Sequence, residues 1–524
     1  MRHKLLFFSV LLGLVLCGGA AIAWSGHTDA AHAASPTSTV IATMPVGSRP
    51  VGESDSWPRA VALTATATAS ALLPSGGPTT LVKTGVFAMR TSTGSQSVTG
   101  VGFKPKVLIL FGVKKTADGF DAGYEFGFGA TDETTEYSIA GHSRSNEFPP
   151  HKGADSDRAQ RPKAITFVQM VGEVSAEADL TSFDDDGFTL DWTTASGYAW
   201  IVHYLAIGGD NIESDIAEFE VLSGSHAYTH VGFKPDLLLL FGAPSSFGPQ
   251  ILGLGFVDSL GNQFAMSGAT QNWGTTPRNA ARYQRTDKCF VALEPNADPI
   301  YVISEAEFVS MDSLGFTLAY SGPTVSIISV AIKGVRAKVG ALTSPASSGD
   351  QAITGVGFSP RGALLAGFNK AASASVEDSN RLTVGVADAN RDVGSVWVGD
   401  TDNEEYYQAD QATYDHLCYF SADAYQPTAP RSSAIVKSWD ADGFSLSWTI
   451  GSDFLQQVGY LLIGDYSSGP VAPVGGIAEP PEATLGGASG NAVPLLMVAG
   501  LLGVAGAMLA GALGAWRVYS VRRR

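Results

Sequence analysis

Cysteine is scarce in this sequence, with three residues in a chain of 524. Cys17 lies in the apolar N-terminal segment, which leaves Cys289 and Cys418 for the rest of the chain. Both lie in apolar, strand-like runs at corresponding positions of an internal repeat. We therefore expect two buried free thiols rather than a disulfide, and a fold that is stabilised by its cores instead of by cross-links.

Positive charge is also scarce. The chain has 33 Lys and Arg against 50 Asp and Glu, a formal net charge of −17, and only 16% of its residues are charged. An acidic chain does not neutralise phosphates, so we expect no nucleic-acid partner. With 45% hydrophobic and 10% aromatic residues, the composition also excludes a disordered chain.

Catalytic signatures are missing as well. The sequence has no Gly-x-Ser-x-Gly, His-Glu-x-x-His, phosphate-binding Gly loop or Cys-x-x-Cys motif. The residues that recur in its repeat are Gly, Phe, Pro, apolar residues and turn Asp, which are typical of a fold rather than of an active site. We expect that the protein is not an enzyme. A membrane-tethered hydrolase with one active copy is the less favoured alternative.

The two ends of the chain predict a membrane protein. Arg2 and Lys4 precede an apolar run and small residues, which is typical of a signal peptide over 1–33. Residues 492–516 are apolar and uncharged, long enough for one transmembrane helix, and a basic tail, 517–524, follows. By the positive-inside rule, we expect a single-pass protein of the cell membrane with its N-terminal ectodomain outside and its C-terminus in the cytoplasm.

The region between the ends contains one unit three times. The sequence Val-Gly-Phe-(Lys/Ser)-Pro begins at positions 101, 231 and 356, and Ser-φ-Asp-x-x-Gly-Phe, where φ is apolar, begins at 182, 310 and 438. These repeats predict three modules, 79–210, 211–336 and 337–468. An Ala/Thr/Ser/Pro-rich linker, 34–78, precedes them, and a Pro/Gly-rich stalk, 469–491, follows.

Apolar patterns indicate β-structure in each module. Phe188, Leu190 and Trp192 alternate with polar residues, as in a strand with one buried face, whereas 107–111 and 237–240 are apolar throughout, as in central strands covered on both faces. We predict an all-β fold of three tandem antiparallel β-sandwich modules, jelly-roll-like and each with its own core, plus one C-terminal transmembrane helix. The glycine of the repeated hairpin turn should take positive φ, at Gly187, Gly315 and Gly443.

Three segments resemble the β-sandwich modules of bacterial surface proteins and of phage tail and virion structural proteins. They are 231–240 (VGFKPDLLLL), 185–192 (DDGFTLDW) and 204–209 (YLAIGG). The resemblance covers about 79–468 and implies a structural β-sandwich. Its motifs are glycines and strand residues, so it implies no functional residue. The predicted signal peptide and transmembrane helix favour the surface-protein branch.

Each module carries a polar insertion that the other two do not share. The insertion at 141–164 has mixed charge, the one at 270–288 is basic, and the one at 399–415 is acidic. Loops that change on a fixed scaffold are typical of diversified binding surfaces, and aromatic residues beside polar ones suit carbohydrate or protein contacts. The candidate binding residues are His142, Arg144, Trp273, Arg278, Arg282, Tyr283, Glu404, Glu405, Tyr406 and Tyr407.

Groups with metal-ligand chemistry are few, and we expect no catalytic residue, no metal and no cofactor. Asp184, Asp185 and Asp186 lack the alternating spacing of a calcium loop, so hairpin turns are favoured and calcium is the alternative. His226 and His230 share one face of a strand without an acidic third ligand. A further polar stretch holds His142, His151, Asp155 and Asp157, and a metal site there is the less favoured interpretation.

Together these patterns predict a membrane-anchored extracellular repeat protein that acts in binding or adhesion. Its partners would be the membrane, through 492–516, and a glycan or protein ligand. The alternative is an envelope or virion structural protein that associates with itself, since the opposite charges of 270–288 and 399–415 suit head-to-tail contacts. Small residues recur every four positions in the transmembrane segment, including Gly503 and Gly511, a spacing that suits a helix pair; the favoured alternative is that Ala and Gly are simply abundant there.

Overall fold

The structure is a computed structural model, and it describes residues 79–144, 156–169, 172–243, 250–271, 280–401, 409–423, 427–450 and 455–466. All of these belong to one compact unit of the chain, 72–524. They contain no α-helix, and hence none with the length and apolarity that a membrane crossing requires. The predicted signal peptide, linker, stalk and transmembrane helix lie outside the described residues.

The regular elements of the described residues are β-strands, which fall into three groups that we call modules 1, 2 and 3. Module 1 contains β1 (Leu81–Ala88), β2 (Gly94–Thr99), β3 (Val107–Val113), β4 (Gly119–Ala122), β5 (Tyr124–Thr131), β6 (Glu136–Ser143), β7 (Ser156–Arg161), β8 (Ile165–Val168), β9 (Val174–Asp184), β10 (Gly187–Thr194) and β11 (Ile201–Gly208). Module 2 contains β12 (Glu213–Val221), β13 (Gly224–Tyr228), β14 (Leu237–Gly242), β15 (Gln250–Asp258), β16 (Gln263–Thr270), β17 (Ala280–Arg285), β18 (Phe290–Glu294), β19 (Tyr301–Asp312), β20 (Gly315–Ser321) and β21 (Val325–Lys333). Module 3 contains β22 (Arg336–Thr343), β23 (Gly349–Thr354), β24 (Pro360–Gly367), β25 (Glu377–Asp378), β26 (Asn380–Asp388), β27 (Val393–Asp400), β28 (Ala409–Tyr414), β29 (Tyr419–Ser421), β30 (Ser432–Asp440), β31 (Gly443–Ile450) and β32 (Gln457–Gly464).

Each module forms one large and one small antiparallel sheet, which confirms the all-β prediction. In module 1 the large sheet has the order β1-β11-β3-β5-β6-β7 and the small sheet the order β2-β10-β9-β8. Modules 2 and 3 repeat this arrangement, with β12-β21-β14-β15-β16-β17 over β13-β20-β19-β18, and β22-β32-β24-β26-β27-β28 over β23-β31-β30-β29. The outer strands are wound as in a jelly roll, since β11 lies between β1 and β3 and β10 pairs with β2, whereas β5-β6-β7 and β8-β9-β10 are meanders of consecutive neighbours.

The central strands have two buried faces because each separates two cores. In β3, Val107, Ile109 and Phe111 pack into a core that the large sheets of all three modules share. Leu108 and Leu110 point the other way, into the core between the two sheets of module 1. The prediction for 107–111 and for the corresponding run in β14 is confirmed, since every residue of both strands is buried.

The expectation of a separate core in each module is wrong in part. Every module has a core between its own two sheets, but the opposite faces of the large sheets form one continuous hydrophobic cluster. Phe128 of module 1 packs edge-to-face on Phe241 of module 2, with ring centroids 5.2 Å apart. Val384 and Leu461 of module 3 belong to the same cluster. The modules therefore bury apolar surface against one another, and their stabilities are coupled.

The two cysteines outside the N-terminal segment are buried free thiols, as predicted. The Sγ of Cys289 donates to the Ala306 carbonyl over 3.3 Å, and the Sγ of Cys418 donates to the Ala434 carbonyl over 3.2 Å. Burial raises the pKa of both thiols, to about 12 for Cys418. Both side chains act as small core residues and not as nucleophiles.

The repeated hairpin turn requires glycine because another strand comes close to it. Gly187 and Gly443 have the predicted positive φ, 156° and 147°, whereas Gly315 does not. At all three glycines, however, a Cβ atom would overlap a carbonyl oxygen of the neighbouring strand. These carbonyls belong to Val98, Tyr228 and Ile353. The close approach, and not the φ value, is the feature that the three copies share.

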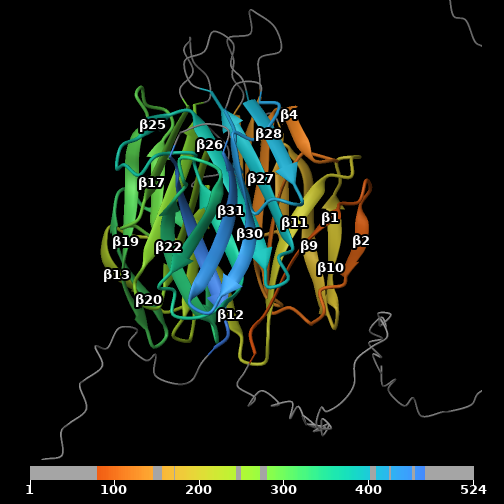
Figure 1. Ribbon diagram of the computed structural model, residues 1–524, viewed down its shortest axis with the longest axis vertical. Coiled ribbons are helices and arrows are strands. Elements are labelled where there is room, and N and C mark those ends of the chain that lie inside the picture. Colours follow the sequence, from red (N-terminus) through yellow and green to blue (C-terminus); the bar gives the residue numbers. More distant parts are fainter. Residues whose placement is uncertain are drawn as a thin grey trace, which may run out of the picture. The chain divides into compact units, whose positions relative to one another are not determined.

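Short strands cross from one module to another. The β4 strand of module 1 pairs with β28 of module 3, and β25 of module 3 pairs with β17 of module 2. Figure 1 shows the orange β4 beside β28, although the two are far apart in the sequence. This exchange covers the outer strands of two large sheets, which would otherwise expose unpaired backbone groups.

The strand registers place the ends of the modular region and the residues beside the insertions at opposite ends of the large sheets. In module 1, Leu81 pairs with Gly208, while Tyr124 pairs with Ser143 at the far end of the sheet, where the insertion begins. The backbone N–H of Thr80 donates to Asp465 Oδ1 over 3.2 Å, so the two ends of the modular region meet. We call these the terminus end and the insertion end; in Figure 1, β4 and β28 lie near the insertion end.

Candidate functional site

The three insertions start and finish at neighbouring positions. Ser143 Oγ donates to Asp400 Oδ2 over 2.6 Å, and Ser156 Oγ donates to the Thr270 carbonyl over 2.9 Å. Asn380 Nδ2 lies 3.4 Å from Thr270 Oγ1. These five residues come from all three modules; Ser143, Ser156, Thr270 and Asp400 lie within the ranges that the sequence singled out, and Asn380 pairs with Asp400. We call them the insertion platform.

The insertions are shorter than the sequence analysis predicted. The ranges 141–164, 270–288 and 399–415 include β7, β17 and β28, which are outer strands of the large sheets. These strands are polar but largely buried, because residues of neighbouring modules cover them. The sequence pattern predicts loops at these strands because they lack the apolar face expected of a strand. Their burial depends on contacts between modules, which the sequence alone does not show.

Arg282 and Tyr283 of β17 are buried and make their contacts within the chain. The Arg282 guanidinium donates to the Ser379 carbonyl over 2.8 Å and to Glu377 Oε2 over 3.0 Å. Both acceptors flank or form β25, so Arg282 holds the exchanged strand of module 3. Burial lowers the pKa of Arg282. The Tyr283 hydroxyl donates to Glu305 Oε1 over 2.9 Å.

His142 lies buried in β6, with Nε2 3.6 Å from Oε1 of Glu125. Burial raises the pKa of Glu125, and Lys114, at 3.0 Å, opposes that shift. Arg144 is half-buried directly after β6. The other candidate binding residues lie outside the described residues; they are Trp273, Arg278, Glu404, Glu405, Tyr406 and Tyr407. Partner binding by these ten residues stays a prediction.

The aspartates of the repeated turn are hydrogen-bond acceptors within the fold. Asp184 accepts from Ser182 Oγ over 2.8 Å and from Thr189 Oγ1 over 2.7 Å. Asp312 and Asp440 accept from hydroxyls at the same two positions of their modules. The amide of Gly102 donates to Asp186 Oδ1 over 2.6 Å. These bonds explain the turn without a calcium ion.

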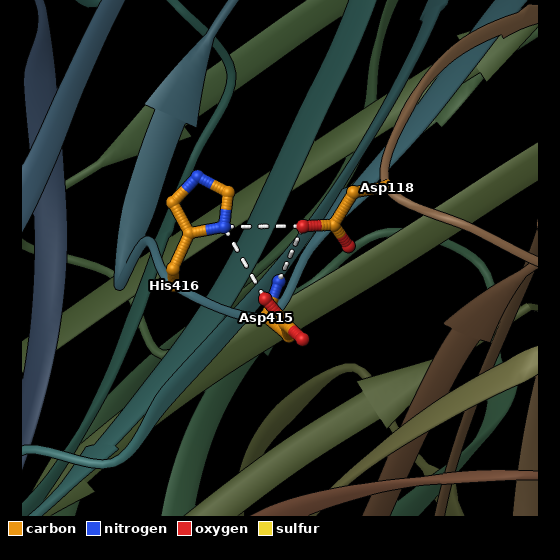
Figure 2. A group of neighbouring side chains, drawn as sticks. All are labelled: Asp118, Asp415 and His416. Carbon is orange, nitrogen blue, oxygen red and sulfur yellow. Dashed lines mark hydrogen bonds and ion pairs between the residues drawn. The ribbon is translucent and has the colours of Figure 1, made fainter.

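One group with metal-ligand chemistry lies at the contact between modules 1 and 3 (Figure 2). Asp118 precedes β4, and Asp415 and His416 follow β28, so the strand exchange brings them together. His416 Nδ1 lies 3.1 Å from Asp118 Oδ2 and 3.2 Å from Asp415 Oδ1. Burial, and then the charge of Asp415, raise the pKa of Asp118. The His416 ring contacts both carboxylates, which accounts for this group as a polar contact between modules.

The histidine pair of module 2 does not form such a group. His226 Nε2 bonds to the Ser223 carbonyl at 2.9 Å, and His230 Nε2 bonds to Ser329 Oγ at 3.2 Å. Among the described residues, Asp118, Asp415 and His416 are the one set of three possible ligands at bonding separation. The two histidines do not share a strand, because β13 ends at Tyr228, and each makes its own polar contacts, which for His230 include Asp215 Oδ2 at 3.8 Å.

Sequence reasoning missed a pocket of about 700 Å³ at the insertion end. It lies where β3, β4 and the segment between β10 and β11 approach Gln411 of module 3. Two aromatic residues of that segment, Tyr198 and Trp200, form one wall. The signal was the segment itself, since 195–200 is longer and more aromatic than Gly322-Pro323-Thr324, which connects the corresponding strands of module 2.

No protein-family model matches this chain, and a search of curated proteins finds no match. Of the resemblance to modules of surface and phage proteins, the structure bears out the coarser part, which is repeated antiparallel β-sheets in the described residues.

Proposed function

We propose that this protein is a membrane-anchored extracellular binding or adhesion protein, in which three tandem β-sandwich modules present their insertions to a partner. The observation that carries the proposal is that the terminus end and the insertion end lie at opposite ends of the large sheets. The modular region begins and finishes at the terminus end, where Thr80 contacts Asp465, and the insertions leave the platform at the insertion end. With a stalk at 469–491 and a membrane helix at 492–516, the insertions would face away from the membrane.

The fold supports the role of a scaffold. The shared core and the bonds between Ser143, Asp400, Ser156 and Thr270 fix the positions from which the insertions leave. The insertions can then differ in length and charge without a change in the core, which is how binding surfaces diversify. Three insertions that start from neighbouring residues of different modules also offer more contact surface than one insertion does.

The carboxylates that recur in the modules support binding rather than catalysis. Asp132, Asp258 and Asp388 are buried, and each accepts bonds from backbone amides of its own turn. The aspartates of the second repeated motif accept hydroxyl groups, as described above. Because these aspartates form structural hydrogen bonds in every module, they do not form a repeated set of general acids and bases.

Self-association is the second candidate. Arg282, Arg285 and Lys288 are paired within the chain, so the opposite charges that two molecules could pair at their insertion ends are Arg278 on one insertion and Asp402, Glu404 and Glu405 on another. Such contacts weaken as salt screens them. This candidate gives an envelope or virion structural protein in which the partner is a second copy of the chain.

The test replaces 272–279 and 402–408, separately and together, by Gly-Ser segments in the full chain held in detergent micelles. Binding is measured to an oligosaccharide array and to immobilised wild-type protein, at low and high salt. We expect the replacements to lose binding and to keep the thermal transition of the wild type. Binding to the immobilised protein alone, with loss at high salt, would favour self-association.

The matched controls lie at the terminus end. Leu260→Asn and Leu314→Asn change side chains that are 75% and 51% exposed, in turns far from the platform. They should bind as the wild type does. Retained binding by the double replacement, or loss of binding by the controls alone, would contradict the proposed function.

A further inference from the structure

The pocket at the insertion end has the features of a small-molecule site. It is lined by residues of module 1 and by one residue of module 3, Gln411. Its polar lining comprises Lys114, Lys115, Asp121, Glu125, Gln169 and Ser196. A concave pocket with one apolar wall and several convergent polar groups is the usual form of a ligand site.

An exposed aromatic ring forms the apolar wall. The ring of Tyr198 is parallel to that of Trp200, with an interplanar angle of 5° and centroids 6.5 Å apart. Trp200 is buried and packs edge-to-face on Phe167 at 5.5 Å, whereas Tyr198 is 64% exposed. The Tyr198 amide donates to Ser196 Oγ over 3.1 Å, which fixes the backbone beside the ring. Tyr198 thus offers a flat apolar face that the fold supports from behind.

The charged groups of the pocket are paired with one another. Lys114 Nζ lies 3.0 Å from Glu125 Oε1 and 5.4 Å from the centre of the Trp200 ring. Lys115 Nζ lies 3.7 Å from Asp121 Oδ2. Because each cation has an anion beside it, the pocket favours neither a phosphate nor a cationic ligand. It offers both donors and acceptors, which a neutral polyhydroxylated ligand requires.

We propose that this pocket binds a neutral sugar ring, which stacks on Tyr198 and bonds through its hydroxyls to the paired Lys114 and Glu125 and to Gln411. The inference deepens the proposed function, because it names an uncharged glycan as the ligand class at the insertion end. It assigns the site to module 1, since that module supplies every lining residue of the pocket except Gln411.

The experiment applies the full chain in detergent micelles to an array of neutral oligosaccharides. We expect binding by the wild type and a loss of about tenfold for Tyr198→Ala, the size of one aromatic contact. Tyr198→Phe keeps the ring and should keep the binding. The matched control is Tyr301→Ala, which removes a ring that is 52% exposed on β19 of module 2, outside the pocket.

The outcomes separate this inference from the proposed function. Equal binding by Tyr198→Ala and the wild type, or no binding of any neutral oligosaccharide by the wild type, overturns the sugar site. Loss of binding in the insertion replacements together with normal binding by Tyr198→Ala overturns the sugar site and leaves the proposed function standing. Loss in Tyr198→Ala with normal binding by the insertion replacements supports the sugar site and overturns the role of the insertions.

Discussion

The carboxylate of Asp388 in module 3 accepts a hydrogen bond from the backbone N–H of Thr84 in module 1, over 3.2 Å. Lys83 Nζ lies 3.2 Å from the same oxygen. The equivalent aspartates reach the following module in the same way. Asp132 accepts from Ser214 Oγ over 3.5 Å, and Asp258 accepts from the Val339 amide over 2.9 Å. The repeated aspartate therefore joins module 1 to 2, 2 to 3, and 3 back to 1.

Removal of one such carboxylate should weaken the contact between modules. Asp388→Ala leaves the Thr84 amide and the turn amides of its own module without their acceptor, so we expect a loss of about 1–3 kcal/mol in the free energy of unfolding. Hydrogen exchange should increase in β1, which carries Thr84. The control is Asp350→Ala, which removes an exposed ion pair with Lys437 and should change stability by about 1 kcal/mol or less. Unchanged exchange in β1 would contradict this role.

The shared core predicts that the three modules unfold together. Phe256 is fully buried in that core, and Phe256→Ala should cost about 3–5 kcal/mol. Differential scanning calorimetry should record one transition, shifted to lower temperature as a whole. Phe316→Ala is the comparison, because Phe316 lies in the core of module 2 alone. Separate transitions, of which only that of module 2 moves, would show that the modules are independent.

Two glycines allow the cost of backbone strain at positive φ to be distinguished from the cost of a Cβ atom that overlaps a neighbouring strand. Gly315 lacks a positive φ, but an added Cβ would overlap the Tyr228 carbonyl, whereas Gly349 has φ 148° and no atom near its Cβ position. Gly349→Ala should cost about 1 kcal/mol through strain. Gly315→Ala should cost more, because the paired strand has to move. Chemical denaturation measures both, and an equal or smaller loss for Gly315→Ala would refute the overlap.

Stability should depend on pH through Glu136. Burial raises the pKa of Glu136 to about 8, and Asp179 adds to that shift. The folded state therefore binds a proton that the unfolded state releases near pH 4.5, and the wild type loses stability as the pH rises through this range. Glu136→Gln keeps an acceptor for the Leu180 amide and has no charge to bury. Its melting temperature, relative to the wild type, should rise from pH 5 to pH 8; a constant difference would exclude this cause.

The sequence predicted the parts of the fold that depend on local pattern. Runs such as 107–111 are apolar on both faces, and the buried β3 follows from this directly. The alternation around Phe188 and the recurrence of turn residues predicted antiparallel sheets in three copies. The shared core was missed, because an apolar residue does not reveal whether it faces its own module or a neighbour. Phe128 and Phe241, which meet across that boundary, look like any other strand residues.

The candidate site was harder to predict because it depends on contacts between modules. Arg282 looked like a solvent-exposed loop residue, and its burial follows from β25, a strand that another module supplies. Asp118 and His416 are far apart in the sequence and meet only through the exchange of β4 (Figure 2). The pocket at Tyr198 had a visible signal in its aromatic segment, but its polar wall comes from three separate parts of the chain.

The most direct test of the central claim is a blocking experiment on cells that carry the full chain. One variant has a short epitope tag within 402–408, and another has the same tag between Ser313 and Leu314 at the terminus end. Binding to the array, or to immobilised protein, is measured with and without a Fab fragment against the tag. The account predicts that the Fab fragment blocks binding at 402–408 and does not block it at Leu314. Blocking at Leu314 alone, or no blocking while both Fab fragments bind, would contradict it.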